Sequence, residues 1–324
     1  MVGPMDLSLI DPQQIELGLR AVKMVAMADG EFDARERKLL ASAERALRRP
    51  GEAARDLDAL APIEPDDLAA KIADPLLRER IVQAQIIMAM MDGDIEASEY
   101  AVVARFAKVL EIDEPRLVNM RQYMDHHYSL LKLDLNRRSQ MVGSAVKHAY
   151  RTAGLRGAWK ATAPFMTKRF AVDEDLAWRY RRLGLLPEGT FGRIYWAHMR
   201  ERGYAFPGEP GGFPEEFIKH DCCHVLGDYD TDPVGECEVI ALICGFMGTD
   251  PFWYLFMITM HMHLGIETFN DNPLGELAFD PERVIAALER GRGVTQDLFA
   301  PGFDWWPLFA KPIDQVRAEY GIAS

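Results

Sequence analysis

Residues 26–37 are AMADGEFDARER and residues 89–100 are AMMDGDIEASEY, so the chain carries one pattern twice at an offset of 63 residues. Each copy follows an apolar run, LGLRAVKMV or IVQAQIIM, with the three- and four-residue spacing of an amphipathic helix. Asp-Gly is typical of a tight turn. The duplication therefore predicts two units of helix, turn and helix, and an all-helical structure for about the first 125 residues.

Acidic side chains lie in and after both predicted turns: Asp29, Glu31, Asp33 and Glu36, then Asp92, Asp94, Glu96 and Glu99. An acid followed three residues later by glutamate has the spacing of a capping box, so turn formation and helix capping are one interpretation. Clustered carboxylates also suit Ca²⁺ or Mg²⁺, which is the alternative. The spacing is not that of an EF-hand loop, because each glycine follows the first aspartate directly.

The duplicated acidic pattern covers about residues 12–122 and resembles the TerB-like domain of tellurite-resistance and stress proteins. The resemblance implies a compact helical bundle with acidic turns. We expect an all-α fold in three parts: a TerB-like helical domain at residues 1–125, a basic linker or amphipathic segment at 126–170, and a mainly helical domain at 171–324.

The middle part is basic within an acidic protein. Residues 137–169 contain eight Lys or Arg and no Asp or Glu, with Tyr150, Trp159 and Phe165 interleaved. Cations with aromatic side chains suit the surface of an anionic membrane. The alternative is a linker whose cations face the acidic first domain, and the sequence leaves both interpretations open.

The overall composition, 48% hydrophobic and 27% charged over 324 residues, is that of a globular protein. A net charge of −13 argues against nucleic acid as a partner. The first residues lack the features of a signal peptide, and the most apolar stretch, 252–266, is too short to span a bilayer. We expect a cytoplasmic protein with free, buried cysteines, because no C-x-x-C pair occurs among Cys222, Cys223, Cys237 and Cys244.

Candidate metal ligands occur in the stretch HDCCHVLGDYDTDPVGE, residues 220–236. The four-residue spacing of His220 and His224 puts both imidazoles on one face of a helix. A short connection to the next helix would bring Glu236 back towards them. Two imidazoles and a carboxylate suit a metal ion, with Asp221 as a fourth ligand or as a partner of a ligand. From the spacing alone, a metal site and ordinary polar side chains on two helices are equally good interpretations.

The helices that carry these residues have recognisable ends. We expect one helix over residues 213–227, with Pro214 near its start and Gly227 just past its end. Thr231 or Asp232 would cap the next helix, with Pro233 at its first position.

The pattern H-D-x-x-H-x(11)-E formed by His220, Asp221, His224 and Glu236 resembles the signature of the Coq4 family of ubiquinone-biosynthesis proteins. LLPEGTFGRIYWAHMRERGY (185–204) and ALERGRGVTQDLFAPGFDWWPLFAKPIDQVRAEYGI (287–322) resemble segments of the same family on either side of the motif. The resemblance covers roughly residues 170–324, so the chain looks like a fusion of TerB-like and Coq4-like parts.

The Coq4 resemblance implies a metal, usually Zn²⁺, held by His220, Asp221, His224 and Glu236, with Fe²⁺ as the alternative. It implies decarboxylation at C1 of a polyprenylated hydroxybenzoate, in some accounts with hydroxylation of that carbon. It also implies other quinone-biosynthesis proteins as partners and peripheral association with the inner membrane. A non-catalytic scaffold with a structural metal is the alternative from another class, and a metal-dependent phosphohydrolase is a third. Whether the chain forms a homo-oligomer stays open.

Other polar and apolar candidates have a structural interpretation beside the functional one. One set of apolar residues could line a cavity for a polyprenyl tail or could simply pack in the core. The set is Phe252, Trp253, Tyr254, Phe256, Met257, Met260, Met262 and Leu264. His261 and His263 are two residues apart and cannot share a helix face, so we expect neither as a ligand. His198, His126, His127 and His148 show no partner spacing, and Cys222 and Cys223 are expected to be bystanders.

Overall fold

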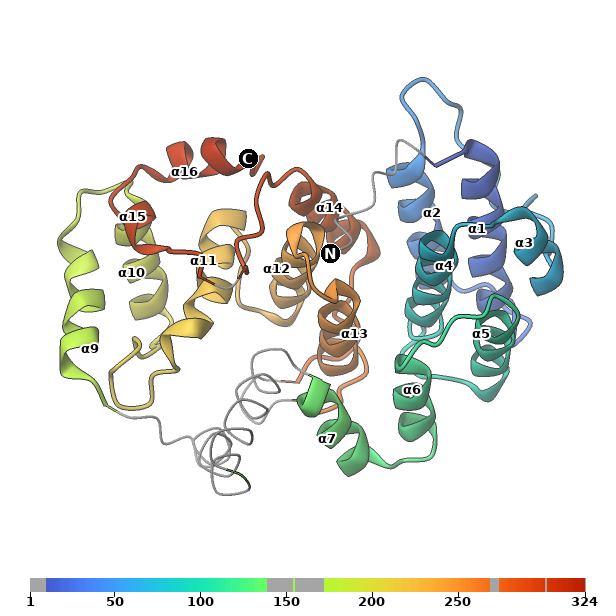
Figure 1. Ribbon diagram of the computed structural model, residues 1–324, viewed down its shortest axis with the longest axis horizontal. Coiled ribbons are helices and arrows are strands. Elements are labelled where there is room, and N and C mark those ends of the chain that lie inside the picture. The colour runs from blue at the N-terminus through green and yellow to red at the C-terminus, as the bar shows by residue number, and fades with distance from the viewer. Residues whose placement is uncertain (1–9, 139–153, 155–171, 269–273, 301, 324) are drawn as a thin grey trace.

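The computed structural model of the chain describes residues 10–138, 154, 172–268, 274–300 and 302–323. These residues contain 15 α-helices and no strand, which confirms the all-α prediction (Figure 1). The N-terminal half consists of α1 Pro12–Ala26, α2 Ala34–Leu47, α3 Pro65–Lys71, α4 Pro75–Met88, α5 Ala97–Val109, α6 Arg116–Met124 and α7 Tyr128–Arg138.

The C-terminal half is also helical, with two 3₁₀ turns, and no described helix is long and apolar enough to cross a bilayer. Its elements are α9 Glu174–Arg181, η2 Arg182–Leu185, α10 Phe191–Glu201, η3 Glu215–Phe217, α11 Ile218–Gly227, α12 Pro233–Phe246, α13 Pro251–Met262, α14 Pro281–Arg292, α15 Trp306–Phe309 and α16 Ile313–Tyr320.

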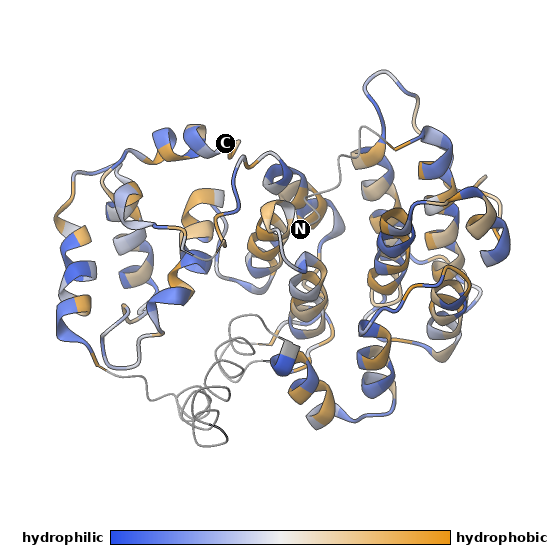
Figure 2. Ribbon diagram, viewed as in Figure 1, coloured by the Kyte–Doolittle hydropathy of each residue, from blue (hydrophilic) through white to orange (hydrophobic). Residues whose placement is uncertain are grey.

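The two repeat units are helix, Asp-Gly turn and helix, as predicted. α1 and α2 form the first unit and α4 and α5 the second, and orange and blue bands alternate along these amphipathic helices in Figure 2. Gly30 and Gly93 have φ angles of 97° and 101°, a left-handed backbone that glycine adopts without strain. The turn at each repeat therefore depends on its glycine.

The acids after each turn cap the following helix. Asp33 accepts a hydrogen bond from the backbone N–H of Glu36 (2.7 Å), and the Glu36 carboxylate accepts one from the N–H of Asp33 (2.9 Å), which completes a capping box. Glu96 and Glu99 form the equivalent box on α5. Among the described residues no metal-compatible group of ligand atoms includes these acids. The contacts are those expected from the capping interpretation.

The capping glutamates of the two repeats are buried beside further carboxylates. Burial raises the pKa of Glu36 to about 7, and Asp33, Asp29 and Asp92 add to the effect. Burial likewise raises the pKa of Glu99 to about 8. Both side chains therefore favour the protonated form more than an exposed glutamate does.

The two halves pack against each other through α2 with α14 and α4 with α13 (Figure 1). Nζ of Lys38 on α2 lies 2.9 and 3.0 Å from the two carboxylate oxygens of Asp280 at the start of α14. Nε2 of His263 lies 3.1 Å from the carbonyl oxygen of Met91, next to the second Asp-Gly turn. Buried apolar side chains of both halves belong to one connected core.

The predicted linker at 126–170 begins with described structure, because α7 occupies residues 128–138. Apart from Arg137, Arg138 and Gly154, the basic stretch 137–169 lies outside the described residues. The proposed domain boundaries and the interpretation of this stretch therefore stay predictions.

The core of the C-terminal half is built around α12, which packs between α13 and α14. The closest approach is at two glycines: a Cβ on Gly291 of α14 would lie 2.0 Å from the carbonyl oxygen of Leu242, and one on Gly245 would lie 2.5 Å from the backbone of Gly291. Only residues without a side chain allow this crossing. It fixes the position of α12, which carries one of the candidate ligands.

Candidate metal centre

The helix with both histidines, α11, is shorter than the sequence predicted. Residues 215–217 form a 3₁₀ turn after Pro214, and the α-helix begins at Ile218. Gly227 is its last residue, and Asp228 has the left-handed conformation (φ 56°), so the prediction that Gly227 lies just past the end is wrong by one residue. An aspartate tolerates this conformation better than most side chains do.

Two arginines hold the C-terminal end of α11. Arg317 donates to the carbonyl oxygens of Leu226 (3.0 Å) and Val225 (3.2 Å). Arg290 donates to the carbonyl oxygen of Gly227 (2.9 Å) and to the hydroxyl of Tyr229 (2.7 Å). Cations that bond the last carbonyls of a helix stabilise its end. The turn after α11 is thus tied to α14 and α16.

The second helix of the site, α12, begins as predicted. Asp232 is its N-cap and accepts a hydrogen bond from the backbone N–H of Gly235 (2.7 Å), with Pro233 at the first helical position. Glu236 therefore lies in the first turn of α12. Because only residues 228–232 separate the two helices, the carboxylate of Glu236 reaches the imidazoles of α11.

His220, His224 and Glu236 form the metal-compatible group of the described residues, with one ligand atom from each within 4.8 Å of the others. Nε2 of His220 lies 3.4 Å from Oε2 of Glu236, and Nε2 of His224 lies 3.2 Å from Oε1. Two ligand atoms bonded to one zinc ion at 2.0–2.1 Å and a tetrahedral angle are about 3.3 Å apart. Each of the two imidazole–carboxylate distances is therefore close to the spacing that such an ion requires.

The other nitrogen of each imidazole has its own partner. Nδ1 of His224 lies 3.3 Å from the carbonyl oxygen of Tyr229, which can only accept, so Nδ1–H donates there. Nδ1 of His220 lies 3.6 Å from Oδ1 of Asp221. Metal-bound histidines regularly have their second nitrogen held by a carbonyl or a carboxylate, as the Tyr229 carbonyl holds His224; the Asp221 carboxylate lies beside His220 at ion-pair distance.

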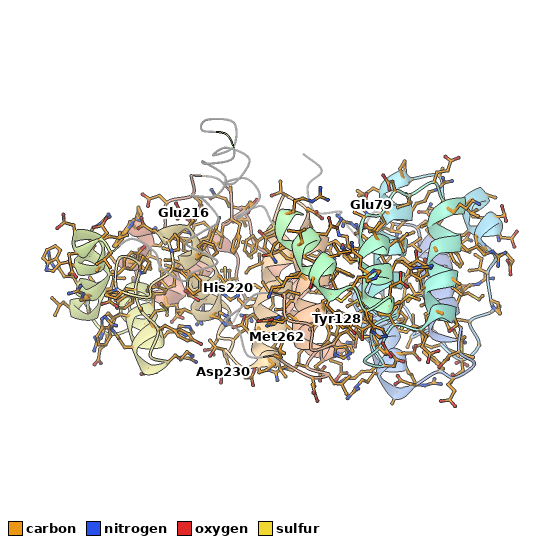
Figure 3. The ribbon with its side chains drawn as sticks, turned by 90° about the horizontal axis from the view of Figure 1, so that it is seen from below. Glu79, Tyr128, Glu216, His220, Asp230 and Met262 are labelled. Carbon is orange, nitrogen blue, oxygen red and sulfur yellow. The ribbon has the colours of Figure 1, made fainter. Side chains whose placement is uncertain are left out.

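The site opens towards solvent on the side of His220. The side chain of His220 is 29% exposed, whereas that of His224 is 1% exposed. In Figure 3, His220 lies inside the layer of side chains, while Glu216 and Asp230 lie nearer its two edges. A molecule entering the site would therefore meet His220 before His224.

The charges at the site favour a protonated His220 and an ionised Glu236. Burial disfavours the imidazolium of His220, but the carboxylates of Glu236 and Asp221 outweigh it and raise the pKa of His220 to about 10. Burial alone would raise the pKa of Glu236, yet the two imidazoles beside it lower that pKa well below the usual range. A metal cation in place of the proton would satisfy the same carboxylate.

Asp221, the fourth predicted ligand, lies outside the group of ligand atoms. Its carboxylate faces Nδ1 of His220, the nitrogen that points away from Glu236. If the group held a zinc ion, Asp221 would lie beside a ligand rather than act as one, and three protein donors would leave room for water or substrate.

α10 contributes His198, for which the sequence showed no partner spacing, and Tyr195, which the sequence patterns did not single out. The rings of His198 and His224 are stacked, with centroids 5.9 Å apart. Burial lowers the pKa of His198 to about 4, with Arg202 and His224 adding to the effect, so its imidazole is neutral. Nε2 of His198 and the hydroxyl of Tyr195 are buried and form no hydrogen bond within the described structure.

Asp221 links Tyr195 to the site, because burial and the Asp221 carboxylate both raise the pKa of the Tyr195 hydroxyl. The three-residue spacing of Tyr195 and His198 places both on one face of α10, and that face packs on α11. The three-residue spacing in GRIYWAHM could have indicated a shared helix face. It indicates a part of the site only when α10 is known to pack on α11.

The other described candidates lie outside the metal-compatible group, and His148 lies outside the described residues. All four cysteines are free and buried, as predicted, and the metal-compatible group does not include them. Nδ1 of His261 accepts from the N–H of Thr268 (3.1 Å), and Nδ1 of His263 accepts from the N–H of Phe279 (3.1 Å). The apolar residues of α13 belong to the core, as the packing interpretation predicts. No protein-family model matches the chain and no curated protein matches it, so the functional argument depends on the motifs and on this geometry.

Proposed function

We propose that the protein is a metal-dependent enzyme of prenyl-quinone biosynthesis that acts in C1 decarboxylation of a polyprenylated hydroxybenzoate. The catalytic role is supported by one observation: His220, His224 and Glu236 bring their ligand atoms together, and Asp221 lies outside this group. Three protein donors leave an exchangeable position, which a catalytic ion needs and a closed structural site lacks.

The choice of reaction rests on the resemblance to the Coq4 family, whose motif coincides with His220, Asp221, His224 and Glu236. A metal ion bound there would act as a Lewis acid that stabilises developing negative charge on the substrate. Zn²⁺ suits the two nitrogens and one oxygen. Fe²⁺ is the alternative, because two histidines and one carboxylate also occur in oxygen-using iron sites.

The protein's own side chains would orient the substrate. Decarboxylation breaks the bond between ring carbon C1 and the carboxyl carbon. CO₂ leaves, the bonding electron pair stays on C1, and a proton from solvent then bonds to C1 in place of the carboxyl group. His198 stacks on His224, and Tyr195 lies three residues before His198 on α10; both carry a buried polar atom without a hydrogen-bond partner in the described structure. Such groups become satisfied when a polar ligand arrives, so they favour one orientation of a ring carboxylate or hydroxyl.

The proposed location is cytoplasmic, with peripheral association with the inner membrane, because a polyprenyl tail keeps the substrate in the bilayer. An anionic membrane surface and other quinone-biosynthesis proteins are the proposed partners. The basic composition of residues 137–169 supports a membrane surface.

The alternative function is a scaffold that organises quinone-biosynthesis enzymes around a structural metal. It requires Asp221 to turn towards the ion and close the shell. The partial exposure of Asp221, 28% of its side chain, leaves room for that rotation. The two functions therefore differ in whether an exchangeable ligand remains.

The test is turnover of a polyprenyl hydroxybenzoate labelled with ¹³C in the carboxyl group, presented in detergent micelles to the metal-loaded protein. We expect release of ¹³CO₂ by the wild type and a loss of at least about 100-fold in His224→Ala. Metal binding without any ¹³CO₂, under aerobic and anaerobic conditions, would refute the enzyme and favour the scaffold.

A further inference from the structure

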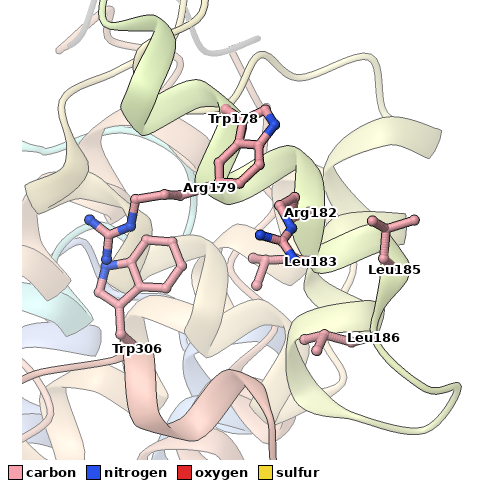
Figure 4. A pocket seen from close by; sticks show the side chains of 7 residues that line it. All are labelled: Trp178, Arg179, Arg182, Leu183, Leu185, Leu186 and Trp306. Carbon is pink, nitrogen blue, oxygen red and sulfur yellow. The ribbon is translucent and has the colours of Figure 1, made fainter.

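The surface around α9, η2 and α15 exposes large apolar side chains. The exposed fraction is 79% for Leu185, 54% for Trp178 and 55% for Val172. This surface contains a groove of about 310 Å³ (Figure 4). The groove is lined by Trp178, Arg179, Arg182, Leu183, Leu185, Leu186 and Trp306. We call this surface the Trp178 face.

Two arginines of the Trp178 face lie over aromatic rings. The guanidinium carbon of Arg179 is 4.0 Å from the ring centroid of Trp306, and that of Arg182 is 4.6 Å from the ring centroid of Trp178. Neither arginine forms an ion pair within the described residues, whereas Arg181 between them pairs with Glu174 and Glu209. Two cations are therefore presented to solvent beside exposed apolar side chains.

The floor of the groove is firmly attached to the core. The indole N–H of Trp306 and the hydroxyl of Tyr180 both donate to Oε1 of Glu215, each at 2.8 Å. The rings of Tyr180 and Trp306 are 4.8 Å apart, and Tyr180 is fully buried. The position of Trp306 is thus set before any partner arrives, which lowers the entropic cost of binding.

We propose that the Trp178 face is where the protein docks on an anionic phospholipid bilayer. Trp178 and Leu185 enter the interfacial region, where amphipathic aromatic rings and apolar side chains are favoured. Arg179 and Arg182 bind lipid phosphates, and their cation–π contacts hold the guanidinium groups in place.

Charge and chain order both support a bilayer as the occupant. The protein carries a net charge of −13, so most of its surface would repel an anionic bilayer. Docking on such a bilayer therefore needs a face with exposed cations. In the sequence, the basic residues Lys168 and Arg169 come shortly before Val172. The inference rests on the proposed association with the membrane and identifies the surface that makes the contact. It does not depend on metal binding.

The test is co-sedimentation of the full-length protein with vesicles of phosphatidylcholine, alone or with about a third of phosphatidylglycerol. We expect binding to the anionic vesicles only. The double variant Trp178→Ser/Leu185→Ser should weaken that binding by at least about tenfold, as expected from the loss of two inserted apolar side chains. Val118→Ser is the matched control, because Val118 is 52% exposed on α6 in the other half and should leave binding unchanged.

A second pair of variants tests the cations. Arg179→Gln/Arg182→Gln should weaken binding to anionic vesicles by at least about tenfold, whereas Arg121→Gln, which removes an exposed arginine paired with Asp125, should not. Metal content measured on the same preparations should be equal in all variants. Weak docking with an unchanged metal content therefore separates this inference from the proposed function at the metal site.

Three results would overturn the inference. The first is equal binding of the wild type and the Trp178→Ser/Leu185→Ser variant to anionic vesicles. The second is a change from dimer to monomer in that variant without any change in vesicle binding, because the face would then bind a second copy of the chain. The third is saturable binding of inorganic phosphate that disappears in the arginine variant while vesicles are not bound, because the groove would then be a site for a free anion.

Discussion

Nε2 of His224 lies 3.2 Å from Oε1 of Glu236, yet it is buried without a hydrogen-bond partner in the described structure. Its other nitrogen is held by the carbonyl oxygen of Tyr229, in a turn that Arg290 ties to α14. A buried ring nitrogen that forms no hydrogen bond beside a carboxylate is costly unless something binds both. This pair of residues is the strongest structural argument for a metal ion between α11 and α12.

Asp221→Asn tests whether Asp221 orients His220 or binds the ion itself. If it only holds Nδ1 of His220, the variant should keep one metal ion per chain with an affinity lowered about 10–100-fold. Competition with a chromophoric chelator measures this directly. Complete loss of metal from a folded Asp221→Asn protein would instead make Asp221 a ligand, as the sequence motif alone allows.

Tyr195→Phe tests the role of the unpartnered hydroxyl on α10. Because the hydroxyl forms no hydrogen bond in the described structure, its removal should leave the free energy of unfolding equal or raise it by up to about 1 kcal/mol. If the hydroxyl orients the substrate, KM or kcat should still change by about tenfold or more. Denaturant unfolding and turnover are measured on the same protein; a stability loss with unchanged turnover would assign Tyr195 a structural role.

Gly291→Ala tests the crossing of α12 and α14. The added methyl group would lie 2.0 Å from the carbonyl oxygen of Leu242, so the helices must separate, at a cost of about 1–3 kcal/mol in the free energy of unfolding. Gly18→Ala is the matched control inside α1, where the nearest atom, on Ile81, lies 3.5 Å away. The control should be neutral or stabilise by up to about 1 kcal/mol, since alanine favours helix. Equal destabilisation by both changes would disprove the tight crossing.

Glu36→Gln and Glu99→Gln test the buried carboxyl groups of the repeats. Since the folded state raises the pKa of Glu36 to about 7 and of Glu99 to about 8, it binds protons more tightly than the unfolded chain. The stabilisation that results is complete below the unfolded value of about 4.5 and is lost as the pH rises through 7 to 8. The glutamines keep a carbonyl oxygen that can accept the capping hydrogen bond.

The expected result is that the Tm of the wild type falls more between about pH 5 and pH 8.5 than the Tm of either variant. Glu16→Gln, on the exposed face of α1, is the control and should follow the wild type. A steeper decline in the variants than in the wild type would show that the two carboxyl groups are ionised in the folded protein.

Local patterns predicted the parts of this structure that depend on neighbouring residues. The repeated Asp-Gly turns, the capping box of Asp33 and Glu36, and the N-cap at Asp232 follow from side chains that bond backbone groups within three residues. The approach of His220, His224 and Glu236 followed from helical periodicity and a short connection.

The rest depends on contacts between distant segments, which periodicity does not encode. The position of His198 beside His224 requires the packing of α10 on α11, and the bond between Lys38 and Asp280 requires α2 to lie against α14. The left-handed residue at the end of α11 is Asp228 and not Gly227, because Arg317 and Arg290 fix the last carbonyls of that helix. The orientation of Asp221 away from Glu236 was likewise a question of rotamer and not of spacing.

The central claim is that His220, His224 and Glu236 hold one metal ion, and metal analysis of purified protein tests it most directly. The wild type, isolated without chelators, should contain one Zn²⁺ or Fe²⁺ per chain, and His224→Ala and Glu236→Gln should contain less than about a tenth of that while remaining helical. His261→Ala should keep the ion, because its imidazole bonds Thr268. A folded wild type that binds no ion at micromolar metal, or variants that retain a full equivalent, would contradict the account.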